Sequence, residues 1–191
     1  MRKIILASSS PRRADLLRQI GLPFDICVRP VDESCPPGLP PHVLVEVLAA
    51  RKAAAVAETA GEGLIIGADT VVVRRKQVLG KPDDENEAVR MLQNLSGGAH
   101  AVFTGLALLD AASGRSLVRH EKTRVHFKRL AEDEIRRYVA TGEPLDKAGS
   151  YGAQGRGAVF VRGIEGCYSN VVGLPLSLLA EMLKEFGRPV I

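Results

Sequence analysis

The chain has 191 residues, of which 46% are hydrophobic and 25% are charged, the balance of an ordinary globular protein. Lys and Arg number 26 against 22 Asp and Glu, a formal net charge of +4 that suits an anionic small molecule as well as nucleic acid. Only 4% of the residues are aromatic and none is Trp, which argues against proteins that bind single strands by stacking bases on aromatic rings.

The three cysteines, Cys27, Cys35 and Cys167, are odd in number and lack C-x-x-C spacing, so they indicate neither a disulfide framework nor a zinc site. The first apolar run ends before Ser8 and is therefore too short to be the apolar core of a signal peptide. No run reaches the roughly 18 apolar residues of a membrane-spanning helix. We therefore expect a soluble, cytoplasmic protein.

Apolar runs and helix-start signals predict the elements of the first half of the chain. Ser10 and Pro11 form a pair preferred at a helix start, as N-cap and first helical residue. In chain order we predict a strand over residues 3–7, a helix from 11 to 21, a strand over 24–28, a loop over 30–41, a helix over 42–60, an apolar strand over 64–73 and a return strand at 78–79.

The second half mixes hairpins with helices. We predict a helix from 83 to 97 with three acids in its first turn, strands over 101–110 and 116–127 joined by a hairpin-like link, a helix over 132–139, a strand over 158–162 inside a glycine-dense segment, and a closing helix over 176–186. Because hairpins interrupt the strand–helix alternation, the sheet should be mixed. The fold class is α+β, in one domain over residues 1–191.

Four features could carry chemistry, and the first is Ser8-Ser9-Ser10-Pro11-Arg12-Arg13. Free N–H groups at a helix start, together with arginines, suit phosphate oxygens. The alternative is a plain helix cap with surface arginines. The second is Asp69, which lies in the most apolar run of the chain and is costly to bury without a partner. It is either a functional carboxylate or an acid satisfied by backbone donors.

The other two features are the lysines and a glycine-rich loop. Lys52 lies mid-helix among alanines, where a lysine is usually solvated, and Lys81 stands between a glycine and a proline, of which the proline restricts its backbone. The loop over residues 143–155 carries acids, a lysine and Gln154, whose amide could bond the edge of a base. This loop is either a ligand-binding segment or a flexible surface loop.

The sequence contains no phosphate-binding P-loop, no G-x-G-x-x-G dinucleotide fingerprint and no G-x-S-x-G nucleophile elbow. An anion pocket of Arg and Lys beside several carboxylates remains. That combination indicates a metal-dependent hydrolase of phosphate esters or anhydrides.

Taken together, seven segments resemble the Maf family of nucleoside triphosphate pyrophosphatases and occur in the family's order from end to end. They are LASSSPRR (6–13), VDE (31–33), GADTVV (67–72), GKP (80–82), TG (104–105), EPLDKAG (143–149) and SNVVGLPL (169–176). The resemblance implies a long, bent mixed sheet flanked by helices, as in the inosine triphosphate pyrophosphatases, and commonly a homodimer. It also implies hydrolysis of a nucleoside triphosphate to the monophosphate and pyrophosphate with Mg²⁺ or Mn²⁺.

Three positions sort substrate classes within this family. The chain resembles the dTTP/UTP branch at Arg12, Thr70 and Gln154, with modified pyrimidine nucleotides as further candidate substrates. It departs from many relatives at Cys167, where they carry an acid.

The resemblance also implies roles for individual residues. Asp69 would be the general base, and Glu33 with Asp69 would hold the metal. Lys81 would be a catalytic residue alongside Asp69 and Glu33. It would also hold the phosphates together with Arg12, Arg13 and Lys52. The substrate-binding residues would be Ser8, Ser10, Arg12, Arg13 and Lys52 for the phosphates and Thr70 and Gln154 for the base.

Three rival functions stay open. A non-catalytic nucleotide-binding regulator of septum formation could use the same pocket, although it has less need of a base. A nucleic-acid-binding module is suggested only by the isoelectric point near 9.1, since the basic residues are scattered. A phosphomonoesterase would release orthophosphate instead of pyrophosphate.

Overall fold

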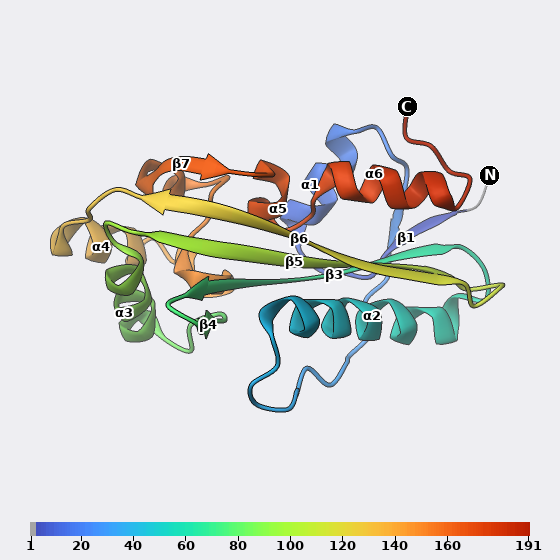
Figure 1. The fold of residues 1–191 in the computed structure, drawn as a ribbon, viewed down its shortest axis with the longest axis horizontal. Helices are drawn as coiled ribbons and strands as arrows, with labels where there is room; N and C mark the ends of the chain where they lie inside the picture. The colour runs from blue at the N-terminus through green and yellow to red at the C-terminus, as the bar shows by residue number, and fades with distance from the viewer. Residues whose placement is uncertain (1–2) are drawn as a thin grey trace. The chain divides into compact units, whose positions relative to one another are not determined.

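A computed structural model describes residues 3–191 and gives a mixed α/β fold (Figure 1). The chain divides into two compact units. Unit 1 comprises residues 3–69, 104–121 and 173–191, and unit 2 comprises residues 70–103 and 122–172. The strands β3 (Leu64–Arg74), β5 (Ala99–Asp110) and β6 (Ser116–Phe127) contribute residues to both units.

Unit 1 is built around parallel strands with helices on both sides. Its own elements are β1 (Ile4–Leu6), α1 (Pro11–Gln19), β2 (Asp25–Ile26), α2 (Pro41–Ala60) and α6 (Leu176–Glu185). Strand β1 pairs in parallel with β2 and with the start of β3. Figure 1 shows α2 on one side of these strands and α1 and α6 on the other. The sheet core is therefore covered on both faces.

Small residues let α2 pack directly against β3. Ala49 and Ala53 on α2 are fully buried. A side chain at Gly67 of β3 would overlap the Ala49 carbonyl oxygen and the Ala53 amide nitrogen. Gly105 of β5 meets the backbone of Val45 in the same way. The helix backbone thus approaches the strands more closely than larger side chains would permit.

Unit 2 holds the shorter elements. They are β4 (Gln77–Leu79), α3 (Glu85–Leu95), α4 (Glu132–Val139), the 3-10 helices η1 (Glu143–Asp146), η2 (Ala148–Ser150) and η3 (Arg156–Phe160), β7 (Val161–Glu165) and α5 (Tyr168–Val172). Strand β4 pairs antiparallel with β3, and β7 pairs antiparallel with β6. The buried side chains of α3 and α4 share a core with Phe127, Tyr151 and Phe160.

The predicted mixed sheet flanked by helices is confirmed, with strand order β2-β1-β3-β5-β6-β7 and β4 on β3. The strand predicted over residues 158–162 is wrong in its bounds. Residues up to Phe160 form η3, and the pairing with β6 runs from Val161 to Glu165. The apolar character of Phe160 reflects burial against the Tyr138 ring, not strand alternation. Helix α5 and the 3-10 helices were not predicted.

The predicted helix starts lie close to the observed ones, but the capping interactions differ from the prediction. Ser10 is the N-cap of α1 and Pro11 its first residue, but the Ser10 side chain makes no capping bond. Asp84 caps α3 by accepting from the Glu87 backbone N–H, so Asp83 precedes the helix and does not belong to its first turn. Among residues 3–191, no helix combines the length and apolar character needed to cross a membrane.

Candidate functional site

The centre of the candidate site is the ammonium of Lys52, which lies between two carboxylates in unit 1. Lys52 Nζ is 2.5 Å from Oδ1 of Asp69 and 2.8 Å from Oε1 of Glu33. Asp69 and Lys52 side chains are only 13% and 17% exposed, whereas that of Glu33 is 60% exposed. A lysine that the sequence alone would leave in solvent therefore pairs with both predicted acidic residues.

The backbone contact between α2 and β3 explains this meeting. Asp69 follows Gly67 by two residues on β3, and Lys52 directly precedes the buried Ala53 that packs on Gly67. Because the helix lies so close, the long lysine side chain can fold along the strand and reach the carboxylate. Burial of Asp69 in its apolar run is thereby compensated by an opposite charge.

Arg13 in the first turn of α1 is held by hydrogen bonds to Gly173 and Ser8 within unit 1. Its Nε donates to the Gly173 carbonyl at 2.8 Å, and its NH1 donates to Ser8 Oγ at 3.0 Å. Ser8 is buried, and its Oγ also accepts from the Ser10 backbone N–H at 3.3 Å. The segment between β1 and α1 is therefore fixed by hydrogen bonds, and Arg13 is not a solvated surface arginine.

The charge of Arg13 is coupled to the carboxylates. Burial is the main cause that lowers the pKa of Arg13, and the positive charge of Arg12 lowers it further. The negative charges of Asp69 and Glu33 raise the pKa of Arg13 but do not outweigh burial. An arginine guanidinium stays protonated at any working pH. Arg12 and Arg13 thus place two positive charges near the carboxylates of Asp69 and Glu33. The arginines suit phosphate groups, and the carboxylates suit a cation bound to those phosphates.

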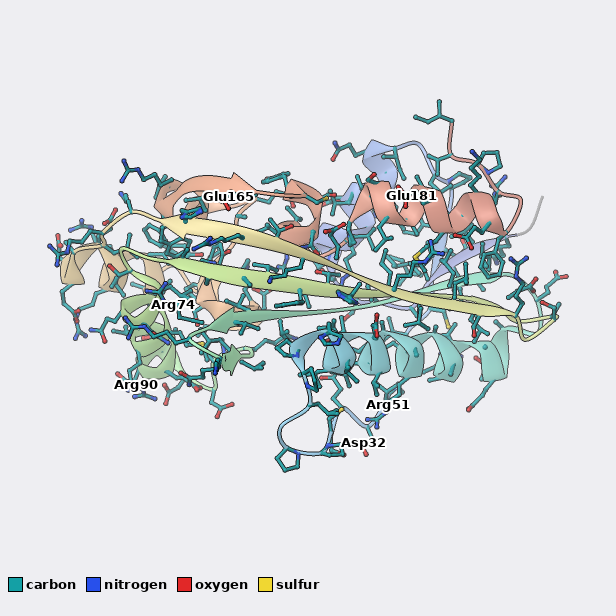
Figure 2. All side chains as sticks on the ribbon, viewed as in Figure 1. Asp32, Arg51, Arg74, Arg90, Glu165 and Glu181 are labelled. Carbon is teal, nitrogen blue, oxygen red and sulfur yellow. The ribbon has the colours of Figure 1, made fainter. Side chains whose placement is uncertain are left out.

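A clamp holds the loop that carries Glu33. Arg51, the neighbour of Lys52 on α2, donates from NH1 to the carbonyls of Asp32 and Ser34 at 2.8 and 2.7 Å. The Asp32 carboxylate in turn accepts from the backbone N–H and hydroxyl of Ser34 at 2.8 and 2.7 Å. Figure 2 shows Arg51 and Asp32 facing each other beside α2. The sequence placed Asp32 in the VDE motif but assigned it no role, and it gave no indication of Arg51.

Two carboxylates converge here, but residues 3–191 contain no group of three or more His, Cys, Asp or Glu side chains that could hold a metal by themselves. Asp69 and Glu33 share the Lys52 ammonium, so their oxygens already accommodate a cation between them. Oxygen ligands of this kind suit Mg²⁺, which in nucleotide sites is commonly held by one or two carboxylates together with the substrate phosphates. The donor set therefore fits a cation that arrives with a polyphosphate.

The remaining predicted site residues divide between the units. Ser10 and Arg12 lie at the start of α1 in unit 1, both partly buried. Thr70, Lys81 and Gln154 belong to unit 2: Thr70 is partly buried on β3, Lys81 is exposed after β4, and Gln154 is exposed in the turn before η3.

A model of the family described as Maf-like protein matches residues 3–186. The chain belongs to the Maf family. It is 62% identical over 191 residues to the dTTP/UTP pyrophosphatase of Pelotomaculum thermopropionicum and 53% identical over 191 residues to that of Desulforamulus reducens, each covering 100% of both chains.

Two solved structures share the fold of this chain at much lower identity. The Staphylococcus aureus Ham1 protein matches with a TM-score of 0.54 at 14% identity, covering 97% of this chain and 100% of its own. A HAM1 protein from Coxiella burnetii matches with a TM-score of 0.51 at 17% identity and the same coverage. At these identities the likeness concerns the fold alone.

Cys167, just before α5, is tied to β6 by hydrogen bonds within unit 2. Its Sγ lies 3.1 Å from Ser169 Oγ, and its backbone N–H and carbonyl both bond the hydroxyl of Thr123, each at 3.1 Å. Asn170, in the same family motif, donates to Thr123 Oγ1 and to the Val102 carbonyl. This part of the SNVVGLPL motif is thus a buried structural junction, whereas its Gly173 carbonyl orients Arg13 in unit 1.

Proposed function

We propose that this chain is a nucleoside triphosphate pyrophosphatase that hydrolyses dTTP and UTP to the monophosphate and pyrophosphate. The observation that carries the proposal is the Lys52 ammonium held between Asp69 and Glu33, with Arg13 electrostatically coupled to both acids. The names of the full-length relatives at 62% and 53% identity support the nucleotide class.

In the proposed reaction, water attacks the α-phosphorus in line and pyrophosphate leaves. Asp69 accepts the proton of the attacking water, and Lys52 orients that carboxylate through its 2.5 Å contact. Arg13 and Ser8, already fixed to each other, donate hydrogen bonds to phosphate oxygens. Arg12 and Ser10 complete the phosphate-binding corner at the start of α1. Preorganised positive groups stabilise the charge that builds up on the phosphates in the transition state.

Glu33 and Asp69 are the residues that would hold a divalent cation, Mg²⁺ or Mn²⁺. When bound, such a cation neutralises phosphate charge and lowers the barrier to displacement. The exposed position of Glu33 suits an acid that meets a cation delivered with the substrate. The Arg51–Asp32 clamp limits how far the Glu33 main chain can move.

Base selection is proposed for Thr70 and Gln154. A pyrimidine such as thymine or uracil presents a carbonyl–imide–carbonyl edge, and a primary amide both donates to and accepts from such an edge. Lys81 is proposed as a further group that acts on the phosphates. These roles follow from the match to the dTTP/UTP branch at Arg12, Thr70 and Gln154.

The same proposal includes a single domain over residues 1–191, a homodimer, a cytoplasmic location and no binding of nucleic acid. Light scattering of the purified chain tests the dimer. A gel shift over a range of salt concentrations tests for nucleic acid, because phosphate-backbone binding weakens steeply with salt.

A substrate panel tests the function. The full chain is assayed with dTTP, UTP, CTP, dATP, dGTP and GTP in the presence of Mg²⁺ or Mn²⁺, and pyrophosphate and orthophosphate are measured separately. We expect pyrophosphate release with dTTP and UTP preferred. Orthophosphate release would identify a phosphatase instead, and tight binding of dTTP without turnover would favour a non-catalytic regulator.

A further inference from the structure

The carboxylate of Glu143 is the hydrogen-bonding centre of the glycine-rich segment in unit 2. Its Oε1 accepts from the Tyr138 hydroxyl at 2.9 Å and from the Gly157 backbone N–H at 3.2 Å. Its Oε2 accepts from the Arg156 backbone N–H at 3.0 Å. The carboxylate is therefore engaged by the protein itself, although it lies in a loop where the sequence leaves a ligand-binding role open.

Tyr138 extends this attachment to the other end of the same segment. Its hydroxyl, while donating to Glu143, accepts from the Gly152 backbone N–H at 3.0 Å. The Tyr138 ring is buried and packs edge-to-face on Phe160, with ring centroids 4.9 Å apart. The main chain is thus fastened at Gly152 and again at Arg156 and Gly157.

The glycines of the segment lie where the chain passes closest to Glu143. A Cβ added at Gly155 would lie 2.5 Å from Glu143 Oε1, and one at Gly152 would lie 2.9 Å from the same atom. A Cβ at Gly157 would lie 2.8 Å from the Tyr138 hydroxyl. These glycines therefore permit close approach to the partly buried Glu143 carboxylate and the buried Tyr138 hydroxyl. The alternative of a flexible surface loop does not account for these contacts.

Glu143 remains ionised in this setting. Burial by itself would raise the pKa of Glu143, but the backbone N–H groups of Arg156 and Gly157, the Tyr138 hydroxyl and the charge of Lys147 together outweigh burial and lower it. Lys147 Nζ also donates to the Glu143 backbone carbonyl at 2.7 Å. An ionised carboxylate accepts charge-assisted hydrogen bonds, which are stronger than neutral ones.

We propose that Glu143 is a positioning residue for nucleotide selection, acting through Gln154. Gln154 is exposed and lies two residues after Gly152 and two before Arg156, so both of its flanks are fastened to the Glu143–Tyr138 pair. This inference rests on the proposed function, in which Gln154 contacts the base. Fixing the main chain on both sides of an amide restricts the directions in which the amide can bond, and discrimination between bases depends on those directions.

The test uses the Glu143→Gln variant of the full chain. The amide keeps the size of the side chain but turns one acceptor oxygen into an NH₂ group that faces a backbone donor. We expect KM for dTTP and UTP to rise about tenfold, the effect of losing roughly one hydrogen bond to the base, with kcat changed less than about twofold. KM for dGTP should change least, so that the preference for pyrimidines narrows.

Asp133→Asn is the matched control, because it removes one negative charge from an exposed side chain of α4 whose ion pair is with Arg137. It should leave all KM values unchanged. If Glu143→Gln does not fold, Tyr138→Phe carries the test, since it removes the hydroxyl that links Glu143 to Gly152. Equal losses for all nucleotides, or a fall in kcat at constant KM, would overturn the proposal.

Backbone hydrogen exchange separates this inference from the proposed function. If the parent protein releases no pyrophosphate, the proposed function fails whatever Glu143 does. Even in that case, the amides of Arg156 and Gly157 should exchange at least about tenfold faster in Glu143→Gln than in Asp133→Asn. The reason is that their acceptor, the Glu143 carboxylate, is replaced by a neutral amide that bonds them more weakly or not at all. Unchanged exchange at both amides would show that Glu143 does not position the segment.

Discussion

Lys52 and Asp69 are 17 residues apart in sequence, yet Lys52 Nζ donates to Asp69 Oδ1 at 2.5 Å. The ammonium also contacts Glu33 at 2.8 Å, so one positive charge serves two carboxylates. Two carboxylates that share a site repel each other unless a cation lies near both. The lysine thus maintains the arrangement on which the proposed hydrolysis depends.

Replacing Lys52 tests that relationship directly. Lys52→Gln removes the charge but keeps a polar side chain on α2, and we expect kcat/KM for dTTP to fall by about 100-fold, the usual cost of losing one preorganised charged donor. Pyrophosphate release measures the effect. Lys184→Gln, an exposed lysine near the end of α6, is the control. Equal activity of the two variants would remove Lys52 from the mechanism.

Asp69→Asn separates chemistry from binding. The amide cannot take a proton from water, so turnover should fall by about 100- to 10,000-fold. Nucleotide binding, measured by calorimetry with dTTP, should be largely retained because Arg13 and Ser8 still hold each other. Asp15→Asn, an exposed acid on α1 paired with Arg18, should behave as the parent. Near-normal hydrolysis by Asp69→Asn would contradict its role as general base.

The Arg51 clamp predicts an effect on activity without a large effect on folding. Arg51→Ala removes the donors to the Asp32 and Ser34 carbonyls and should release the Glu33 loop. We expect kcat/KM to fall about tenfold, while Tm changes by no more than a few degrees because the loop is exposed. Arg90→Ala, an exposed arginine on α3, is the control (Figure 2). A loss in Arg90→Ala equal to that in Arg51→Ala would point to general charge effects.

Gly67→Ala should disturb the packing of α2 on β3. The added methyl would overlap the Ala49 carbonyl oxygen and crowd the Ala53 amide, so the helix must shift. Overpacking of this kind costs about 2 kcal/mol and should lower Tm by roughly 5 °C. Gly163→Ala in β7, where no heavy atom lies within 4 Å of the added Cβ, is the matched control. Calorimetry of both variants makes the comparison, and equal Tm values would mean that the close approach is not required.

His100 makes stability sensitive to acid. Burial, with smaller contributions from the charges of Arg74 and His126, lowers the pKa of His100 to about 3 from 6.5. Between these values the unfolded chain binds a proton that the folded chain does not, so the free energy of unfolding decreases as pH falls from 6.5 toward 3. By pH 5 the loss from this residue is roughly 2 kcal/mol.

Urea unfolding at pH 7 and pH 5 measures that loss. His100→Gln can keep a hydrogen bond to the Tyr151 hydroxyl, which lies 2.8 Å from Nε2, and should reduce the difference between the two pH values. His42→Gln, an exposed histidine in unit 1, should keep the full difference. The same difference in both variants would show that His100 is not its source.

Local pattern was sufficient for most of the secondary structure. The bounds of β6 and α4 agree with the sequence to the residue, as does the start of α1 at Pro11. These elements depend on spacing, capping and turn residues that lie within a few positions of one another. The order of the motifs was likewise enough to place the chain in its family.

Only the tertiary structure decided which polar groups meet. The sequence singled out Lys52, Glu33 and Asp69 separately, but their contacts depend on how closely α2 packs against Gly67. It offered no reason to couple Glu143 to the amides of Arg156 and Gly157. Hydrogen bonds and ion pairs form over about 3 Å, whereas sequence patterns locate elements to within a few residues. The close packing of α2 against Gly67 sets the positions of Lys52 and Asp69 to within hydrogen-bonding distance.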